Sequence, residues 1–273
     1  MKTARKQQPV DTEELRAYLD RKVEQFNRPD FIADDPVCIP HMFTRKEDIE
    51  IAGFFAATLA WGRRPAIIAS GEKLMQLMGM APFDYVMQAR DPDLERLDDF
   101  VHRTFNANDA RCFVKALRHM YLHEGGLEHV FAQGADTGDM GVAIHRFRKV
   151  FFSQSHALRC EKHVSDPMRN SAAKRINMFL RWMVRRDKGG VDFGLWHSVS
   201  PSMLMCPLDV HSGTVARMLG LLNRKQNDWQ AVEELTANLR KFDASDPVRY
   251  DFALFGTGVN REERWPGALR ESL

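Results

Sequence analysis

The sequence predicts an all-α protein, and three observations support this class. Apolar residues recur at helical spacing along most of the chain. No clear run of alternating apolar and polar residues indicates a strand. The chain has 273 residues, 44% of them hydrophobic, so it can bury a substantial core. We therefore expect one compact domain over residues 1–273, with roughly ten helices that pack as two lobes.

The first expected helix carries a start signal and is followed by an irregular segment. Asp11 precedes an amphipathic run over residues 13–23, in the position that a helix cap favours. The stretch 28–40 is interrupted by prolines, which limit regular helix. We expect this stretch to be ordered but irregular.

The next two helices are predicted to form a hairpin. Thr44 and Glu47 have the spacing of a capping box at the start of an apolar helix over 49–61. Pro65 suits the first turn of a second helix, which reaches about residue 80. The short connection between these two helices favours antiparallel packing.

The remaining helices are inferred from apolar residues that recur every three or four positions. They are expected at residues 82–88, 109–123, 127–131, 140–152, 170–186, 210–222, 228–242 and 247–255. The glycine-rich breaks between them are too short to serve as flexible linkers between domains.

Charge is balanced overall but unevenly distributed. The formal net charge is +2, which by itself favours neither nucleic acid nor membrane. Residues 169–188 hold seven Lys and Arg against one Asp, whereas residues 84–99 hold six acids against two Arg. The basic stretch is a candidate surface for a polyanion. Alternatively, the two stretches pair with each other inside the protein.

Cysteine spacing and hydropathy limit the other function classes. The four cysteines form no CxxC pair, so we expect no metal cluster and no cofactor. The chain has no signal-like N-terminus and no apolar run of bilayer length. These features predict a cytoplasmic protein with reduced thiols and no membrane association.

The stretch 207–220 holds the first candidate catalytic residue. Asp209 stands where a helix begins, ahead of apolar residues at 215, 218, 219 and 222. An Asp in this position accepts hydrogen bonds from free backbone N–H groups, so an ordinary cap would explain it. The alternative is a catalytic carboxylate.

The helix expected over 170–186 holds the second candidate. One face is apolar, and a neighbouring face carries Lys174, Arg181 and Arg185. Lys174 is a candidate nucleophile, because a lysine amine can attack a sugar carbon and form a Schiff base. The alternative is an ordinary surface amine or a phosphate contact.

The stretch 207–220 resembles the helix-hairpin-helix (HhH-GPD) DNA glycosylases, in which a helix opens with V-D-x-H-V-x-R-V-x-x-R-L-G. Asp209, His211 and Val215 lie at matching offsets, as do Leu219 and Gly220, whereas Thr214 replaces the first Arg of the motif. The resemblance covers mainly residues 45–80 and 170–258. It implies a glycosylase fold and a catalytic Asp209 that stabilises an oxocarbenium-like sugar.

The resemblance also implies which residues contact DNA. Residues 49–64 are similar to an early helix that ends beside the DNA in this family, and here that end carries Trp61, Arg63 and Arg64. Trp61 could stack on an extruded base while the two arginines hold phosphates. A Trp61 that merely caps the core is the alternative.

The motif identifies the nucleophilic lysine less clearly than it identifies Asp209. The family's L-P-G-V-G turn and its following lysine are missing at the usual distance before Asp209. Lys188 lies 21 residues upstream and is the second choice. Lys174 lies 35 residues upstream, in a stretch similar to the archaeal oxidised-guanine glycosylases, and is the first choice. The resemblance then implies that Lys174 attacks the sugar.

In that arrangement four further residues would contact the DNA: Arg175, Arg181, Arg185 and His211. The chain as a whole also resembles a family of uncharacterised bacterial proteins, for example over residues 177–185 and 250–256. That second resemblance implies no activity.

The sequence thus predicts a base-excision DNA glycosylase for damaged duplex DNA, with or without lyase activity towards abasic sites, acting on oxidised bases. One alternative is a noncatalytic nucleic-acid-binding helical protein in which Asp209 is only a cap. Another is a metal-dependent hydrolase that uses Asp209, His211, His197 and His41.

Overall fold

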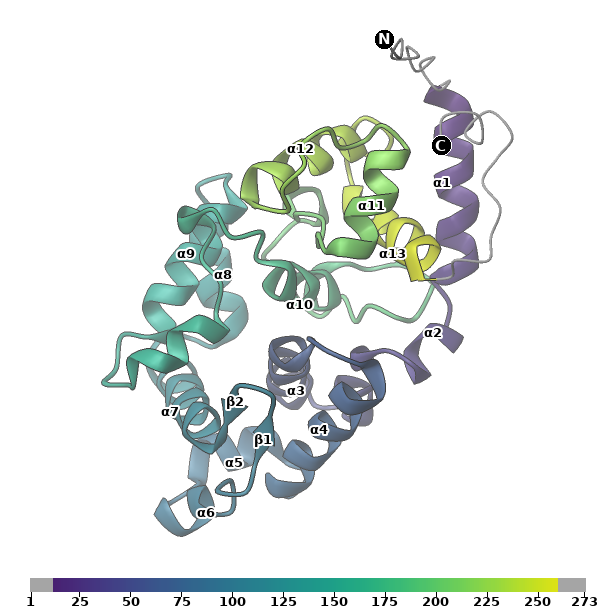
Figure 1. The fold of residues 1–273 in the computed structure, drawn as a ribbon. Coiled ribbons are helices and arrows are strands. Elements are labelled where there is room, and N and C mark those ends of the chain that lie inside the picture. Colours follow the sequence, from purple (N-terminus) through teal and green to yellow (C-terminus); the bar gives the residue numbers. More distant parts are fainter. Residues whose placement is uncertain (1–11, 260–273) are drawn as a thin grey trace, which may run out of the picture.

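Residues 12–259 are described in the computed structural model of Figure 1, and they are predominantly helical, as predicted. Within this range the strands are confined to an antiparallel hairpin of β1 (Val101–His102) and β2 (Phe105–Asn106). No helix in this range combines the length and the apolar character needed to cross a bilayer. Asp11, predicted to cap the first helix, lies outside the described residues.

The α-helices are α1 (Thr12–Phe26), α2 (Asp30–Ala33), α3 (Lys46–Leu59), α4 (Arg64–Leu77), α5 (Pro82–Gln88), α6 (Asp91–Glu95), α7 (Ala107–His123), α8 (Leu127–Ala135), α9 (Met140–Phe151), α10 (Lys174–Val184), α11 (Val210–Met218), α12 (Trp229–Arg240) and α13 (Asp251–Val259). The 3₁₀ turns are η1 (Pro36–Cys38), η2 (Pro40–Met42), η3 (Leu158–His163), η4 (Pro167–Arg169), η5 (Pro201–Met203) and η6 (Pro247–Tyr250). Each helix expected from periodicity is present, with ends shifted by a few residues. The short elements α2, α6 and the β hairpin lie below what periodicity can detect.

The predicted capping box before α3 is wrong. The chain is extended at Phe43, and α3 begins only at Lys46, with Arg45 as an N-cap residue that makes no side-chain capping bond. Glu47 instead accepts a bond of 3.2 Å from Arg45 Nε. The predicted hairpin of α3 and α4 is confirmed by their mutual packing.

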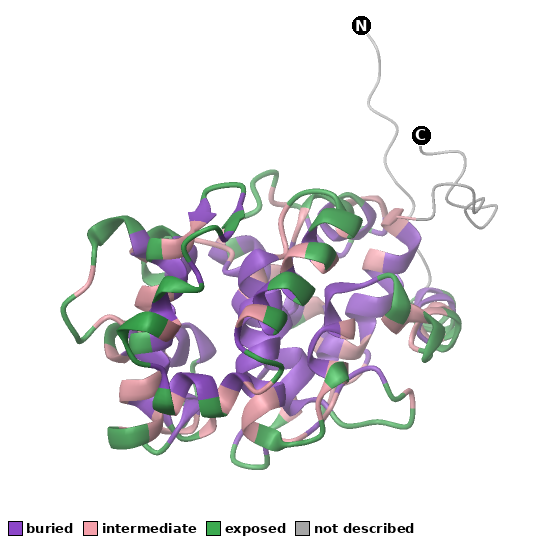
Figure 2. Ribbon diagram, turned by 90° about the horizontal axis from the view of Figure 1, so that it is seen from below, coloured by how far each residue is buried: buried purple, intermediate pink, exposed green. Residues whose placement is uncertain are grey.

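Helix α10 lies at the centre of the molecule, with α3 against it, α7 to α9 on one side, and α11 and α13 on the other (Figure 1). The rings of Phe54 on α3 and Phe179 on α10 meet edge to face, with centroids 5.5 Å apart. Both rings are fully buried, as is Trp182 on the next turn of α10. Figure 2 shows the buried residues concentrated on these inner helices, so α10 is enclosed on most of its circumference.

Two glycines allow α13 to lie between α1 and α11. A Cβ atom on Gly256 would come within 2.3 Å of the Phe26 ring of α1. A Cβ atom on Gly258 would come within 2.9 Å of the backbone oxygen of His211 on α11. Close approach at both positions brings α13 beside the start of α11, where Asp209 lies.

Gly134 provides a direct test of the packing between α8 and α9. A Cβ atom there would lie 2.5 Å from Cα of Ala143, which is backbone and cannot rotate away. We expect Gly134→Ala to lower the free energy of unfolding by about 1–3 kcal/mol, measured by urea denaturation. Gly53→Ala is the matched control, because its Cβ would meet the flexible end of Met183 at 3.1 Å. Equal stability of the two variants would contradict the close packing of α8 against α9.

Candidate active site

A cavity of about 670 Å³ opens where α10, α11 and α13 meet the turn between α3 and α4. Its walls combine aromatic rings with charged groups, including Phe31, Trp61, Phe255, Lys174 and Asp209. A volume of this size is typical of small-molecule sites, and most of the lining side chains come from elements far apart in the sequence. The cavity is therefore a product of the tertiary fold.

The two residues predicted to perform the chemistry face each other in this cavity. Lys174 is the first residue of α10, and Asp209 is the N-cap residue of α11. The distance from Lys174 Nζ to Asp209 Oδ2 is 3.8 Å, and about a quarter of each side chain is exposed, 25% and 23%. An amine and a carboxylate thus lie together with access to a ligand.

The carboxylate of Asp209 uses its two oxygens differently. Oδ1 accepts hydrogen bonds from the backbone N–H groups of His211 and Ser212, at 2.8 and 3.0 Å. Ser212 Oγ in turn accepts from the backbone N–H of Asp209, at 3.0 Å, which completes a capping box. Oδ2 is directed at Lys174. The cap therefore fixes the side chain and leaves one oxygen for another role.

Two buried carboxylates in the same cavity were not predicted. Asp251 begins α13, and Asp35 caps η1 through a bond of 3.1 Å from the backbone N–H of Val37. Burial raises the pKa of Asp251 to about 6, against the attraction of Arg181, and the nearby charge of Asp209 adds to the increase. Burial likewise raises the pKa of Asp35. In the sequence both resemble ordinary helix-start residues, so only their burial distinguishes them.

Phe255 is a further residue that the sequence did not single out. Its ring lies 5.9 Å from Lys174 Nζ and 5.0 Å from the guanidinium carbon of Arg64. The His211 ring meets it edge to face at 6.4 Å. Phe255 thus provides an aromatic wall beside the amine, one helical turn after Asp251.

The other predicted contact residues lie at or near the cavity. Trp61 and Arg64 line it. Arg175 also lines it and donates a bond of 2.5 Å to the backbone oxygen of Thr58. The exposed His211 lies at its edge, and the exposed Arg63 is the N-cap residue of α4.

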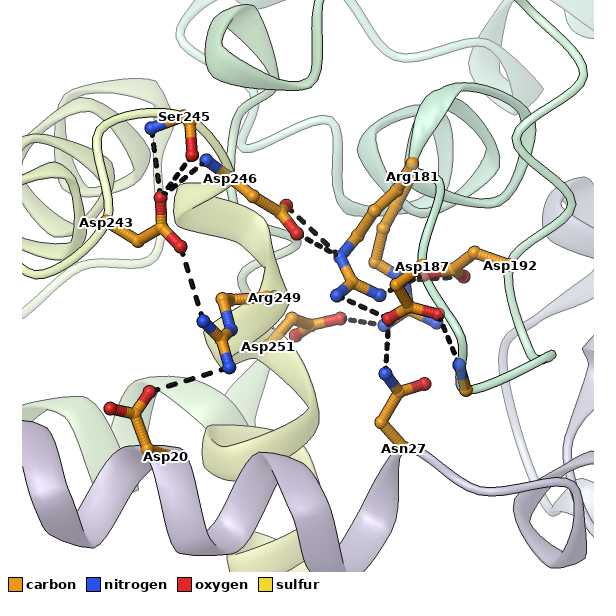
Figure 3. Close-up of polar contacts among 12 residues, drawn as sticks. Asp20, Asn27, Arg181, Asp187, Asp192, Asp243, Ser245, Asp246, Arg249 and Asp251 are labelled. Atoms are coloured by element: carbon orange, nitrogen blue, oxygen red, sulfur yellow. Dashed lines mark hydrogen bonds and ion pairs between the residues drawn. The ribbon is translucent and has the colours of Figure 1, made fainter.

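Arg181 and Arg185 do not lie on an exposed basic face, contrary to the expectation, although Arg181 contributes to the wall of the cavity. They are only 3% and 2% exposed. Arg181 Nε donates to Asp192 at 3.2 Å, and its other end pairs with Asp251 (Figure 3). Arg185 pairs with Asp192 at 3.0 Å and with Asp246 at 2.9 Å. Buried charges require such pairing, so these arginines are structural.

The two charge-rich stretches do not pair with each other. Two acids of residues 84–99, Asp84 and Asp98, pair with Arg45 and Arg111. The network around Arg181 and Arg185 draws its carboxylates from later in the chain. Three of the seven basic residues, Lys174, Arg181 and Arg185, thus pair with carboxylates that lie outside residues 84–99.

Lys188 is also excluded as the partner of Asp209. It is exposed and lines a separate cavity of about 620 Å³ beside α1, together with Asn27 and Arg249. Because the two cavities share no lining residue, Lys188 does not share the Asp209 cavity. Of the two lysines considered, only Lys174 does.

The residues of the proposed metal site do not converge. His41 bonds to the backbone oxygen of Val191 at 2.9 Å and stacks on Phe193, while His197 contacts Arg186. Among residues 12–259, no group of three or more His, Cys, Asp or Glu side chains has a geometry that could hold a metal ion. The structure therefore does not support the metal-dependent hydrolase.

Comparison with known proteins identifies the family but no activity. Residues 35–260 match the family described as a protein of unknown function, DUF2400, and the chain belongs to this family. This range includes both buried aspartates and the pair of Lys174 and Asp209. The chain matches no curated protein and no solved structure.

Removing Asp192 tests the buried network. Asp192→Ala leaves two buried guanidinium groups without a shared partner, so we expect the free energy of unfolding to fall by about 3–5 kcal/mol. Asp84→Ala is the control, because it removes an exposed partner of Arg45 and should cost at most about 1 kcal/mol. Urea denaturation of both variants measures the difference, and similar losses would contradict a structural role for the network.

Asp251 predicts a specific pH dependence of stability. Its pKa is about 6 in the folded protein against 3.8 for the ordinary group, so the folded state binds the proton more tightly. Protonated Asp251 therefore makes its whole contribution to the free energy of unfolding below about pH 4, and this contribution is lost as the pH rises to 6. Relative to Asp251→Asn, the wild type should lose on the order of 3 kcal/mol across this range. Urea denaturation at several pH values measures both proteins, and parallel curves would contradict the expectation.

Proposed function

We propose that this protein is a DNA glycosylase of the helix-hairpin-helix type, with lyase activity, that removes oxidised bases from duplex DNA. The observation that carries the proposal is the distance of 3.8 Å between Lys174 Nζ and Asp209 Oδ2 inside a cavity. The sequence around Asp209 resembles the glycosylase helix, and an amine lies beside this carboxylate, which supports a role for both groups in such chemistry. An extruded nucleotide would enter the cavity, because chemistry on a base requires its removal from the stack.

In the proposed reaction, Lys174 supplies the electron pair. Once the ammonium of Lys174 has released a proton to water, the amine attacks C1′ of the sugar, so that the N–C1′ bond forms and the glycosidic bond breaks. The base departs with the electron pair of that bond and takes up a proton from water. The proton lost from the nitrogen of Lys174 passes to Asp209 Oδ2, the oxygen that the cap leaves unused. As C1′ becomes electron-poor, the same carboxylate stabilises it by charge.

The lyase step follows from the covalent intermediate. Opening of the sugar ring gives a Schiff base between Lys174 and C1′. Loss of a proton from C2′ then breaks the bond between C3′ and its oxygen, and the 3′ phosphate leaves with the electron pair. Water hydrolyses the Schiff base and restores the amine.

A second candidate is a noncatalytic nucleic-acid-binding protein. The observation that favours it is the complete capping box of Asp209, which accounts for one oxygen and the conformation of this residue without catalysis. Under this reading, binding would depend on salt but no base would be released.

Borohydride trapping on a duplex with an abasic site or an 8-oxoguanine tests the proposal. We expect the wild type to form a covalent adduct, because borohydride reduces the Schiff base. Lys174→Ala should abolish the adduct, whereas Lys188→Ala should leave it unchanged. Asp209→Asn should keep the thermal midpoint, because Asn caps as well as Asp, yet slow adduct formation by about 100-fold or more.

The outcomes separate the candidates. If the wild type forms no adduct, the proposed lyase activity is contradicted. Base release, measured chromatographically on the same duplex, then decides between a glycosylase without lyase activity and the noncatalytic binding protein. An adduct that survives Lys174→Ala would contradict the assignment of the nucleophile.

A further inference from the structure

The hairpin of β1 and β2 contributes a cation to the rim of the cavity, from a segment that the glycosylase resemblance does not cover. Arg103 lies at the tip of this hairpin and is exposed. Its guanidinium carbon lies 4.5 Å from the centre of the Trp61 ring, in a cation–π contact. Because Trp61 lines the cavity, Arg103 lies next to the cavity wall.

Two backbone features place the guanidinium on that ring. Arg103 has a φ of 56°, a left-handed conformation that costs free energy for a residue with a Cβ atom. Gly62 has a φ of 115°, and a Cβ atom there would lie 3.0 Å from Arg103 Nη1. Backbone strain of this kind concentrates at functional sites and persists where the surrounding structure enforces it.

The rest of the hairpin is firmly anchored. Phe105 is fully buried, and His102 Nδ1 lies 2.9 Å from Ser70 Oγ on α4. His102 Nε2 lies 3.3 Å from the backbone oxygen of Trp61. The hairpin and the end of α3 are therefore linked directly, and the position of Arg103 is set by both.

Arg103 has the charge environment of a residue that binds an anion. Among residues 12–259, no carboxylate oxygen lies within 4.0 Å of its guanidinium. The exposed Arg63 follows Gly62 in the same turn, and Arg64 lines the cavity. Three arginines thus lie near one edge of the cavity. In contrast to Arg181 and Arg185, Arg103 has its charge free for a ligand.

We propose that Arg103 binds a backbone phosphate of the DNA strand whose nucleotide enters the cavity, while its stacking holds Trp61 as a wall of that cavity. This inference rests on the proposed DNA substrate but does not require base release. The recognised chemistry is a phosphodiester, and a free nucleotide would offer a similar group. The experiment must therefore compare the two sources.

The test measures dissociation constants by fluorescence anisotropy over a series of KCl concentrations. The probes are a duplex with a tetrahydrofuran abasic site and, as competitor, the mononucleotide dGMP. For Arg103→Ala we expect about tenfold weaker duplex binding and a salt slope smaller by about 1, the loss of one phosphate contact. Arg146→Ala on α9 is the matched control, because it removes an exposed arginine away from the β1–β2 hairpin, and it should change neither value.

A second variant separates binding from structure. Arg103→Gly removes the guanidinium and also the cost of the left-handed backbone, so its thermal midpoint should equal or exceed that of the wild type. Its duplex binding should nevertheless be weakened as in Arg103→Ala. A merely structural Arg103 would instead give a less stable variant with an unchanged salt slope.

The remaining outcomes are distinct from those of the proposed function. Equal affinity and slope for Arg103→Ala and Arg146→Ala would overturn the inference while leaving the glycosylase proposal standing. If Arg103→Ala binds the duplex more weakly and the wild type releases no base, the result supports the inference about Arg103 and contradicts the glycosylase proposal. A wild type that binds dGMP as tightly as the duplex, or binds no duplex, would overturn the inference.

Discussion

The pairing of Arg181 and Arg185 with buried carboxylates is the interaction on which the rest of the structure depends. Arg181 lies in the last turn of α10 and Arg185 is the C-cap residue of this helix. Together they reach Asp192 in the following loop, Asp246 before η6 and Asp251 at the start of α13. Because an unpaired charge in the interior costs several kcal/mol, α10, this loop and α13 must adopt one relative arrangement. The central helix is thereby tied by its C-terminal half to the elements that surround the cavity.

The same arrangement positions the chemical groups at the other end of α10. Fixing α13 places Phe255 one turn beyond Asp251 and beside Lys174. The chain that leads into α10 is held from α12, because Asn170 Nδ2 donates to Asp228 at 3.2 Å and the backbone forms a bridge at Ser171. Lys174 is therefore held from both sides, and its distance to Asp209 follows from contacts made elsewhere.

The sequence predicted the local features, but it did not predict the role of a charged residue where that role depends on burial. The helix start at Asp209 and a helix that holds Lys174 follow from capping and periodicity, which act within a few residues, although α10 begins at Lys174 and not at residue 170. The roles of Arg181 and Arg185 could not be predicted, because their partners, apart from Asp187 beside Arg185, are 7 to 70 residues away in the sequence. An arginine that faces DNA and one that faces a buried aspartate produce the same pattern along a helix. For the same reason Asp35 and Asp251 were overlooked.

The buried acids also bear on the choice between an enzyme and a binding protein. A site that only holds phosphate gains nothing from Asp35 and Asp251, because each carboxylate repels the ligand and loses hydration on burial. Strongly perturbed acids beside an amine are, however, common where a positive charge develops and protons are transferred. With Lys174 and Asp209 at 3.8 Å, the cavity places three carboxylates around one candidate nucleophile. The same walls carry Lys174 and three arginines, Arg64, Arg175 and Arg181, so cations balance the acids, and the close pair of amine and carboxylate, rather than the net charge, is what favours the proposed glycosylase over a binding protein.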